Sequence, residues 1–568
     1  MQTSKIQIKG NLKSLFLAAV LLSSCAGGQV GKNNSGEYKN GMVVTAHPSA
    51  SKVGLDILKK GGNAVDAAVA VQFALAVVYP NAGNIGGGGF MVYRSAQGET
   101  AALDFREKAP GMASRDMYLD PQGNPITEKS LYGHLAAGVP GSVDGMVQAH
   151  AKYGKLSWAD VVQPSVDLAR NGFPVTERQS REFAGEQKEF KKYNPGKSYY
   201  IKDSWASGEL WIQEDLANTL ELIRDKGREG FYGGEVADHI VAEMKSGGGL
   251  ISKDDLKNYH AVWREPIVGN YREYKVITVP PPSSGGIALL QLLNSVEPFP
   301  LKRWGYNSDS TVQVMVEAER RVYADRASHL GDPDFYKVPQ KHLILPDYSK
   351  ARMSNFNWNK ASLSTDIKAG EVPKESEETT HFSIVDKAGN AVSITTTING
   401  SYGSKVFVKG AGFLLNNEMD DFSVKPGTPN MYGLLGGEAN SVQPNKRMLS
   451  AMTPTILEKD GQLFMVVGTP GGSTIITSVF QTILNVIDFN KSMQAAVSAK
   501  RFHHQWFPDD VAMERNGLDS MTVVRLSQKG YKFRERGAIG RVDAILKTKW
   551  GYYEGGADPR GDDTKLGW

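Results

Sequence analysis

A chain of 568 residues is longer than one simple hydrophobic core supports, so its length predicts either several domains or one large α/β unit. Hydrophobic residues make up 40% and charged residues 22%, which is typical of an ordinary globular protein and excludes a disordered or fibrous one. The formal net charge of +4 includes three lysines near the N-terminus, so no basic stripe indicates a nucleic-acid partner.

The first residues are typical of an export signal. Three lysines precede an apolar run over residues 15–22, and no acidic residue lies among them. This basic region and short apolar region are too short to span a bilayer as a mature helix, so the sequence predicts a secretory signal peptide over residues 1–24. Its removal lowers the formal net charge to about +1, and neither sign of charge then indicates a partner.

The signal ends in Leu22-Ser23-Ser24-Cys25, which resembles a bacterial lipobox, where small residues precede a cysteine that is lipidated and becomes the mature N-terminus. Cys25 is the only cysteine, so no disulfide forms within a monomer. The alternative is an ordinary signal peptide with an incidental cysteine. We expect an exported lipoprotein of the bacterial cell envelope, periplasm-facing or at the surface. Its only membrane contact is a lipid on Cys25, followed by a flexible tether at 25–40.

Two segments in the first part of the chain predict close packing. Asn63-Ala64-Val65-Asp66-Ala67-Ala68-Val69-Ala70 begins an Ala-rich helix that should be buried, and it leads into the glycine cluster at 83–89. These glycines have no Gly-Lys-Ser/Thr and no strand–GxGxxG–helix order with a later acidic residue. They therefore predict close approach of backbones and not a phosphate loop.

Further along, residues 157–291 have the pattern of helices with short connections, and the loop at 280–286 (PPPSSGG) predicts another helix from Ile287. The charged, proline-containing run at 368–378 predicts an exposed linker, after which the pattern becomes that of β-strands. Without HExxH or paired cysteines, we interpret the adjacent histidines at 503–504 as structural or supporting residues. No GxSxG elbow occurs, which disfavours an α/β-hydrolase.

Residues 379–397 predict a β-hairpin. Two β-prone runs flank the three-residue loop Lys387-Ala388-Gly389, with glycine last, where a left-handed conformation is needed. Centring the turn on Ala388 brings Thr379 opposite Thr397. Directly opposed residues have Cβ atoms about 4.5–5.5 Å apart, so two hydroxyls meet at the open end of the hairpin unless a bulge shifts the register.

The position of Thr379 distinguishes it from an ordinary cross-strand threonine, which is a common sheet stabiliser. It directly follows the exposed linker, where the chain could be cut without harming the fold. Once the chain is cut, the α-amino group of Thr379, with a reference pKa of about 7.7–8.0, lies beside its hydroxyl as a built-in general base. Thr379 is therefore the candidate N-terminal nucleophile.

A second feature suits the same chemistry. Phe464-Met465-Val466-Val467-Gly468 predicts a buried strand, and Thr469-Pro470-Gly471-Gly472-Ser473 connects it to an apolar helix from Thr474. Glycines between a strand and the start of a helix present free backbone N–H groups, which suit an oxyanion. A tight turn without chemistry explains this feature equally well.

Together these residues resemble the γ-glutamyltransferases (γ-glutamyltranspeptidases) of the N-terminal nucleophile hydrolase superfamily. The resemblance runs from about Gly41 to the C-terminus, with its motifs in the family's order. The matching stretches are Asp104-Phe105-Arg106-Glu107, the loop at 280–286, Thr379-Thr380-His381-Phe382-Ser383, Leu415-Asn416-Asn417-Glu418-Met419-Asp420-Asp421-Phe422, Gly468-Thr469-Pro470-Gly471-Gly472-Ser473 and Arg501-Phe502-His503-His504-Gln505-Trp506.

The resemblance implies an α/β fold: a four-layer αββα sandwich of the N-terminal nucleophile hydrolase type, built from two subunits of one precursor. Self-cleavage between Glu378 and Thr379 gives a large subunit over 41–378 and a small catalytic subunit over 379–568, which remain together as a heterodimer. Thr379 is then the nucleophile of both processing and catalysis, and Thr397 hydrogen-bonds to it. The resemblance implies no cofactor and no metal.

The resemblance also implies which residues contact the substrate. The matching residues are Arg106 and Ser450 for the α-carboxylate, Asn399, Glu418 and Asp421 for the α-ammonium group, Gly471 and Gly472 for the oxyanion hole, and Tyr432 for a lid over the site. One departure concerns the family's Leu-Ser-Ser-Met, which is Leu449-Ser450-Ala451-Met452 here. Because Ala451 has no hydroxyl, we expect a weaker hold on the α-carboxylate.

The implied reaction transfers the γ-glutamyl group of glutathione or a related donor to water, an amino acid or a peptide, through an ester on Thr379. The alternative on the same scaffold is a cephalosporin or glutaryl acylase, whose relatives alter contacts to the α-amino and α-carboxylate groups that this chain retains. A different class of alternative is an unprocessed binding lipoprotein. Loss of Thr379 or of the glycine pair would have favoured that alternative.

Overall fold

The computed structural model describes residues 36–196, 198–370, 380–425, 427–435 and 437–568. Residues from Glu37 to Trp568 form one compact unit. The expected signal peptide, Cys25 and most of the expected tether lie outside the described residues, as do Glu378 and Thr379. No helix within these described ranges is long and apolar enough to cross a bilayer.

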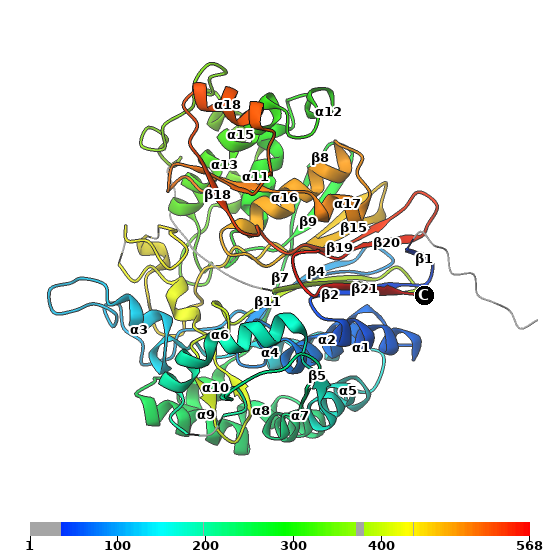
Figure 1. Ribbon diagram of the computed structural model, residues 1–568, viewed down its shortest axis with the longest axis vertical. Helices are drawn as coiled ribbons and strands as arrows, with labels where there is room; N and C mark the ends of the chain where they lie inside the picture. Colours follow the sequence, from blue (N-terminus) through cyan, green and yellow to red (C-terminus); the bar gives the residue numbers. More distant parts are fainter. Residues whose placement is uncertain (1–35, 197, 371–379, 426, 436) are drawn as a thin grey trace, which may run out of the picture. The chain divides into compact units, whose positions relative to one another are not determined.

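Two seven-stranded sheets form the middle of the unit, and the strand pairs within each are antiparallel (Figure 1). The first sheet has the order β1 (Glu37–Tyr38), β20 (Tyr553–Gly556), β19 (Asp543–Lys547), β15 (Gln462–Gly468), β14 (Thr455–Lys459), β9 (Tyr274–Thr278) and β8 (Ile267–Tyr271). The second has the order β21 (Thr564–Gly567), β2 (Met42–Thr45), β10 (Thr380–Val385), β11 (Ala391–Thr397), β3 (Gly88–Arg94), β4 (Thr100–Asp104) and β7 (Val262–Arg264).

Apolar side chains divide the unit into four layers, because successive residues of a strand point to opposite faces. Val44 of β2 packs between the sheets with Val466 of β15. The adjacent Val43 instead packs with helices below the second sheet, and Val467 packs with helices above the first. Figure 1 shows the same order of layers, with α1 and α2 on one side and α11 and α16 on the other. The predicted αββα sandwich is confirmed.

The helices belong to two groups. Those packed through the second sheet's apolar cluster are α1 (Pro48–Lys59), α2 (Ala64–Val78), α4 (Ser142–Tyr153), α5 (Trp158–Asn171), α6 (Glu177–Tyr193), α7 (Glu214–Lys226), α8 (Glu229–Tyr232), α9 (Gly234–Gly247) and α10 (Lys253–Asn258). Those packed through the first sheet's cluster are α11 (Gly285–Val296), α12 (Leu301–Trp304), α13 (Asp309–His329), α14 (Gln340–Leu343), α16 (Thr474–Ile487), α17 (Met493–Ser498) and α18 (Ser520–Gln528). Smaller elements are α3 (Thr127–Leu131), α15 (Pro346–Arg352), β5 (Phe173–Pro174), β6 (Leu210–Trp211), β12 (Phe407–Val408), β13 (Phe413–Leu414), β16 (Phe502–His503), β17 (Val511–Glu514) and β18 (Phe533–Arg536).

The predicted hairpin is present as β10 and β11, with Thr380 opposite Thr396 and Val385 opposite Ala391. This register is the one expected from a turn centred on Ala388. The Asp386 carboxylate accepts three backbone N–H groups of the turn, at 2.9–3.0 Å, and Gly389 has φ +92°. Glycine is therefore the residue that adopts the left-handed conformation without strain.

The predicted Ala-rich helix is α2, and all of its residues are buried. Asn63 caps it and Asp66 returns the capping bond, which is the capping-box pattern. The following glycines pack as predicted: a Cβ at Gly87 would lie 2.0 Å from the Thr397 carbonyl, and one at Gly89 would lie 2.4 Å from the Thr395 carbonyl. Small residues here let β3 and its neighbours lie directly against β11.

The helical interpretation of residues 157–291 is incomplete, because this region also supplies β7, β8 and β9. Their signal in the sequence is weak: β8 is an edge strand that alternates in burial, with Val268 exposed, and it joins β9 through a tight turn in which Arg272 has φ +54°. The helix after the loop at 280–286 begins at Gly285, two residues earlier than predicted.

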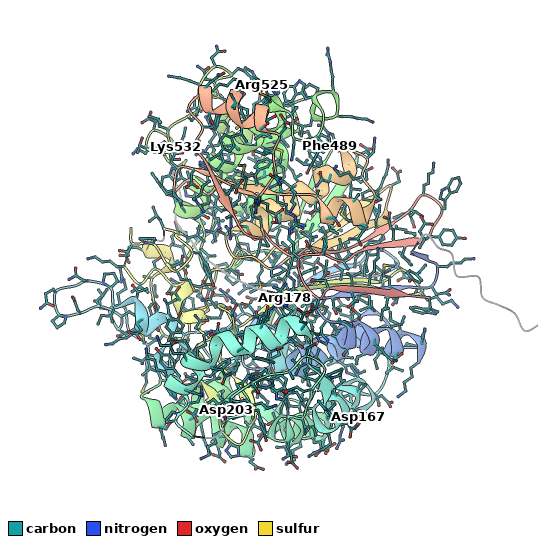
Figure 2. The ribbon with its side chains drawn as sticks, in the orientation of Figure 1. Asp167, Arg178, Asp203, Phe489, Arg525 and Lys532 are labelled. Carbon is teal, nitrogen blue, oxygen red and sulfur yellow. The ribbon has the colours of Figure 1, made fainter. Side chains whose placement is uncertain are left out.

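Both sheets combine strands from before and after the predicted cleavage point. In the second sheet, β10 lies between β2 and β11, and β11 pairs with β3. Helices join the two parts as well: Arg178, labelled in Figure 2, pairs with Glu182 within α6 and donates a hydrogen bond to the Arg560 carbonyl near the C-terminus. A single cut before Thr379 therefore leaves both pieces interleaved through shared sheets.

Candidate active site

The open end of the β10–β11 hairpin is the starting point of the site. Thr397 ends β11, and its hydroxyl accepts a hydrogen bond from the Asn399 backbone N–H at 2.7 Å. Asn399 has φ +64°, so the chain turns sharply here and brings its side chain back beside the strand end. Such left-handed conformations are several-fold enriched in asparagine. Thr379, which this register would pair with Thr397, lies outside the described residues.

Arg106 lies close to this strand end and is fully buried. Its guanidinium donates to the Leu449 carbonyl at 2.8 Å and forms ion pairs with Asp421 and, at 2.8 Å, with Glu418. Burial disfavours its charge, but Glu418 and Asp421 outweigh that effect and raise the pKa of Arg106 above its usual value. Arg106 is therefore a fixed, permanently charged fork among carboxylates.

The carboxyl groups of Glu418 and Glu107 make this cluster unusual. Burial raises the pKa of Glu418 well above its usual range, although Arg106 and the Thr397 hydroxyl lower it. Burial likewise raises the pKa of Glu107 to about 8, and its carboxyl oxygens accept no hydrogen bond from any described residue. The cluster thus contains more acidic groups than cations, all fully buried. An added cation would stabilise their ionised forms.

Asn399 and Tyr432 meet above this cluster. The Tyr432 hydroxyl donates to Asn399 Oδ1 at 3.3 Å, and Asn399 Nδ2 donates to the Asn417 carbonyl at 2.9 Å. The segment that carries Tyr432 is organised by Asn430, whose side chain accepts from the N–H groups of Tyr432 and Leu434. Tyr432 is half-buried and so lies between the site and solvent.

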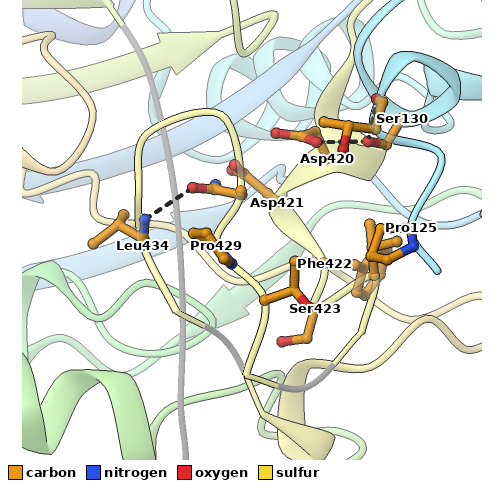
Figure 3. A pocket seen from close by; sticks show the side chains of 12 residues that line it. Pro125, Ser130, Asp420, Asp421, Phe422, Ser423, Pro429 and Leu434 are labelled. Carbon is orange, nitrogen blue, oxygen red and sulfur yellow. Dashed lines mark hydrogen bonds between the residues drawn. The ribbon is translucent and has the colours of Figure 1, made fainter. Parts of the chain in front are cut away.

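A pocket opens beside Asp421 between this segment and the residues around α3 (Figure 3). It is lined by Pro125, Thr127, Ser130, Asp420, Asp421, Phe422, Ser423, Val424, Thr428, Pro429, Asn430 and Leu434. Figure 3 shows the hydrogen bond from Ser130 to Asp420, which measures 2.6 Å. The pocket adjoins the acidic cluster through Asp421, whose side chain stays buried.

Ser450 and Ala451 lie in an extended segment held by the loop at 280–286. The Ser450 carbonyl accepts from Ser284 N–H at 2.7 Å and from its hydroxyl at 2.8 Å. The Ser450 hydroxyl accepts from Met452 N–H at 3.2 Å. Ala451 is fully buried in the apolar cluster above the first sheet, whereas Met452 packs between the sheets. The alanine methyl therefore has a packing role.

The glycine pair lies where β15 leads into α16. Gly471 has φ +137° and Gly472 has φ +60°, conformations that residues with a Cβ rarely adopt. Their carbonyls already begin the helix by accepting from Thr474 and Ile475 N–H groups. A helix start directs backbone N–H groups and the positive end of the helix dipole outward, which suits a developing negative charge.

Sequence reasoning did not single out several residues of this region. Glu107 and Asp420 belong to stretches that match the family, but the resemblance gives them no role of their own. Both are buried acids next to residues that are expected to contact the substrate. His381 lies on the same face of β10 as Ser383 and hydrogen-bonds Ser383 and Thr395 hydroxyls at 3.0 Å. For His381, the period-two spacing from Thr379 along the predicted strand was the available signal. In the described residues no three His, Cys, Asp or Glu side chains gather as a metal site.

Comparison with known proteins identifies the family. A family model described as γ-glutamyltranspeptidase matches residues 50–568. This chain belongs to the γ-glutamyltranspeptidase family. It is 48% identical over 535 residues to the glutathione hydrolase proenzyme of Escherichia coli (strain K12), a match that covers 93% of this chain and 92% of the relative.

Solved structures support the same fold. The structure resembles a cephalosporin acylase from Bacillus halodurans with a TM-score of 0.83 at 27% identity, over 97% of this chain and 99% of that chain. It also resembles a γ-glutamyltranspeptidase chain from Helicobacter pylori with a TM-score of 0.56 at 45% identity, over 57% of this chain and 95% of that chain. The expected family and the expected fold are both confirmed.

Proposed function

We propose that this γ-glutamyltranspeptidase family member cleaves the γ-glutamyl amide bond of glutathione and related compounds. It transfers the γ-glutamyl group to water or to an amino-acid or peptide acceptor. The observation that carries the proposal is the buried Arg106 fork surrounded by Asp421 and Glu418, at the end of the β10–β11 hairpin. The 48% identity to a glutathione hydrolase proenzyme supports the same substrate.

The charges of this cluster fit the α-amino acid end of a γ-glutamyl donor. An α-carboxylate matches the planar Arg106 guanidinium, which binds carboxylates through two parallel hydrogen bonds. An α-ammonium group matches Asp421 and Glu418, with Asn399 as a further acceptor. Burial raises the pKa of Glu418 even beside Arg106. A bound ammonium group adds a second positive charge, which favours the ionised form of Glu418. Ser450 is positioned in the same segment as the Leu449 carbonyl that Arg106 contacts.

We assign the nucleophile to Thr379. The described β10–β11 register ends at Thr380–Thr396, and continuing it by one residue would place Thr379 opposite Thr397, whose hydroxyl accepts the Asn399 N–H. In the precursor, Thr379 Oγ attacks the Glu378 carbonyl, the peptide C–N bond breaks, and an ester forms. Water then hydrolyses the ester, which leaves a carboxylate on Glu378 and a free α-amino group on Thr379.

The mature enzyme repeats this chemistry on the donor. The Thr379 amino group takes the hydroxyl proton as Oγ attacks the γ-carbonyl, and returns a proton to the leaving amine, such as Cys-Gly. The N–H groups at Gly471 and Gly472 stabilise the oxyanion of the tetrahedral intermediate. Water or an acceptor amine then attacks the γ-glutamyl ester and releases Thr379. Tyr432 covers the site during these steps.

The two products of processing stay associated because both sheets contain strands from each. β10 pairs with β2 on one side and with β11 on the other, and β14 pairs with β9. Separating a small subunit over 379–568 from a large subunit over 41–378 breaks these ladders and exposes the core between the sheets. The functional unit is therefore a heterodimer of the two pieces.

The acylase alternative has one observation in its favour, the TM-score of 0.83 with the cephalosporin acylase at 27% identity. That likeness concerns the shared scaffold. A substrate with a neutral or purely anionic acyl end needs no pair of acids beside Arg106, whereas Glu418 and Asp421 are both in ion-pair contact with it. The charge pattern therefore favours a zwitterionic γ-glutamyl donor over a glutaryl or cephalosporin side chain.

The place of action that we propose is the bacterial cell envelope. Its support is the sequence Leu22-Ser23-Ser24-Cys25 behind an apolar run, which predicts export, lipidation of Cys25 and a membrane-anchored enzyme. Two acyl chains on one residue anchor a protein stably, where a single chain gives only reversible binding.

A γ-glutamyl anilide assay, with and without a dipeptide acceptor, tests the function. Release of the anilide without acceptor measures hydrolysis, and extra release with acceptor measures transfer. A glutaryl anilide that lacks the α-amino and α-carboxylate groups is the matched control and should react far more slowly. Equal or faster turnover of the glutaryl compound contradicts the γ-glutamyl assignment and supports the acylase.

A further inference from the structure

The segment Pro429–Leu435, defined here as the lid segment, is held to the rest of the molecule by the buried Leu434 side chain and by hydrogen bonds from several parts of the chain. The Tyr432 hydroxyl donates to Asn399, and the Met431 N–H donates to Asp420 at 3.4 Å. A third hydrogen bond comes from a different part of the chain: Gln505 Nε2 donates to the Tyr432 backbone carbonyl at 3.2 Å. Figure 3 shows Pro429 and Leu434 of this segment beside Asp421.

Gln505 is fixed by a chain of hydrogen bonds that reaches α16. His503 Nε2 lies 2.9 Å from Gln505 Oε1, and His503 Nδ1 lies 2.9 Å from the Thr477 hydroxyl of α16. Thr477 is one turn into the helix that begins just after Gly471 and Gly472. The chain therefore connects the lid segment to the element that carries the proposed oxyanion hole.

The direction of these hydrogen bonds follows from the chemistry of the groups. The Tyr432 carbonyl only accepts, so the amide nitrogen of Gln505 must face it and Oε1 must face His503. His503 Nε2 therefore carries the proton, and Nδ1 accepts from the Thr477 hydroxyl. Burial lowers the pKa of His503 to about 3, so the ring is neutral and has one proton to donate. The Thr477 hydroxyl also lies 3.1 Å from the Thr474 carbonyl, and the protonated Nε2 of His503 requires that the hydroxyl proton be directed to Nδ1.

We propose that Gln505 is a positioning residue that keeps the lid segment closed over the γ-glutamyl ester. This proposal rests on the function proposed above. Closing the segment places Tyr432 against Asn399 and excludes bulk water from the site. Loss of the Gln505 contact lets the segment open, so the donor binds less tightly and water reaches the ester more readily. Gln505 thereby increases the fraction of the γ-glutamyl ester that reacts with an amine acceptor and not with water.

Two variants separate this contact from other effects. Gln505→Glu keeps an acceptor for His503 but cannot donate to the Tyr432 carbonyl, and Gln505→Met removes both bonds at similar length. Gln187→Glu is the matched control, because Gln187 of α6 also donates to a loop carbonyl, that of Tyr200 at 2.7 Å, and accepts a backbone N–H. Thr477→Val removes only the far end of the chain and should give a smaller effect in the same direction.

Loss of one net hydrogen bond lowers the ratio of closed to open lid segments about fivefold. We expect the Gln505 variants to show about fivefold faster amide hydrogen exchange in residues 429–435 and about a fivefold higher KM for a γ-glutamyl anilide. Their kcat should change by about twofold or less, and hydrolysis should gain on transfer to a dipeptide. Gln187→Glu should match the parent in all four measurements.

Unchanged exchange in residues 429–435, together with an unchanged KM and an unchanged ratio of hydrolysis to transfer, overturns the proposal. A general structural defect is recognised by faster exchange throughout the chain and by loss of kcat in place of KM, and it also overturns the proposal. Absence of γ-glutamyl turnover in the parent refutes the proposed function instead. In that case the exchange measurement on the lid segment still tests the Gln505 contact alone.

Discussion

Thr380 lies directly opposite Thr396 in the antiparallel pair of β10 and β11, and both are buried. The same register, continued by one residue, would pair Thr379 with Thr397, whose hydroxyl accepts the Asn399 N–H at 2.7 Å. We expect this hydroxyl, which the Asn399 N–H orients and which also lowers the pKa of Glu418, to contact the nucleophile. This relationship connects the hairpin geometry to the chemistry that we propose.

We therefore predict that Thr397→Val slows both self-cleavage and γ-glutamyl transfer, because it keeps the shape of the side chain but removes its hydroxyl. Loss of one positioned hydrogen bond of this kind lowers a rate by about tenfold to a hundredfold. Thr397→Ser keeps the hydroxyl and should retain most of both rates. The rates follow from band intensities of the precursor over time and from the anilide assay.

Thr396→Val is the neighbouring control, because its side chain faces Gly88 and Asn84 on the other side of the sheet. It should affect stability more than the processing rate. Normal processing by Thr397→Val would contradict the Thr379–Thr397 pairing.

Local patterns made much of this site predictable. A turn of three residues with glycine last fixes a hairpin register, so the opposition of Thr380 and Thr396 follows from counting outward from Ala388. The strand–glycine–helix order around Gly471 is equally local. Both features depend on residues close together in sequence, where backbone sterics and hydrogen bonding decide the outcome.

The acidic cluster could not be predicted in the same way. Arg106 follows β4, whereas Glu418 and Asp421 lie some three hundred residues later, and only the fold brings them within ion-pair distance. Resemblance to a family assigned them roles, but not their mutual contact or the raised pKa values of Arg106 and Glu418. The strands β7 to β9 were missed because they are short, and because β7 and β8, at the edges of their sheets, have few buried residues.

Ala451 supports a second prediction. Restoring a hydroxyl with Ala451→Ser should lower the KM for glutathione by up to about tenfold, since hydrogen bonds to a charged group contribute about 1.5–3 kcal/mol and water already recovers part of it. The kcat should hardly change, because the α-carboxylate is bound similarly in the ground and transition states. Steady-state kinetics with glutathione provide both values.

The same substitution places a hydroxyl in an apolar cluster, so the midpoint of thermal unfolding should also fall slightly. Ala113→Ser, in a different buried cluster, is a control for that cost. A lower midpoint with an unchanged KM would mean that Ala451 serves packing alone and does not face the α-carboxylate.

Asp420 gives a pH dependence. Burial raises its pKa from 3.8 to about 6, against hydrogen bonds from Ser130 and the Met431 N–H. The folded protein therefore keeps a proton that the unfolded chain releases, so its contribution to stability is complete below about pH 4 and is lost as the pH rises through about 6. The loss is on the order of 3 kcal/mol.

Urea unfolding of the uncleaved Thr379→Ala chain between pH 4 and pH 7 tests this. Asp420→Asn in the same background should lack this loss, so its stability relative to the parent should rise with pH and level off above about 6. Asp203→Asn, at an exposed position labelled in Figure 2, is the control. Parallel profiles for parent and Asp420→Asn would show that Asp420 does not titrate as described.

The proposed anchor makes a prediction in cells. Cys25→Ala should move γ-glutamyl activity from the membrane fraction to a soluble fraction, because dual acylation anchors a protein stably and the variant has no thiol to acylate. Metabolic labelling with a fatty acid should mark the parent and not the variant. Activity that stays with membranes in Cys25→Ala would refute the lipid anchor while leaving the enzyme assignment intact.

The central claim is that Thr379 becomes the N-terminal nucleophile, and N-terminal sequencing with intact mass of the purified protein tests it most directly. We predict two co-purifying chains, the smaller beginning at Thr379 and ending at Trp568. Thr379→Ala should remain one chain without γ-glutamyl activity. Incubation with a slow γ-glutamyl donor should add one γ-glutamyl group to Thr379. A small chain that begins at any other residue, or an active uncleaved chain, would contradict the account.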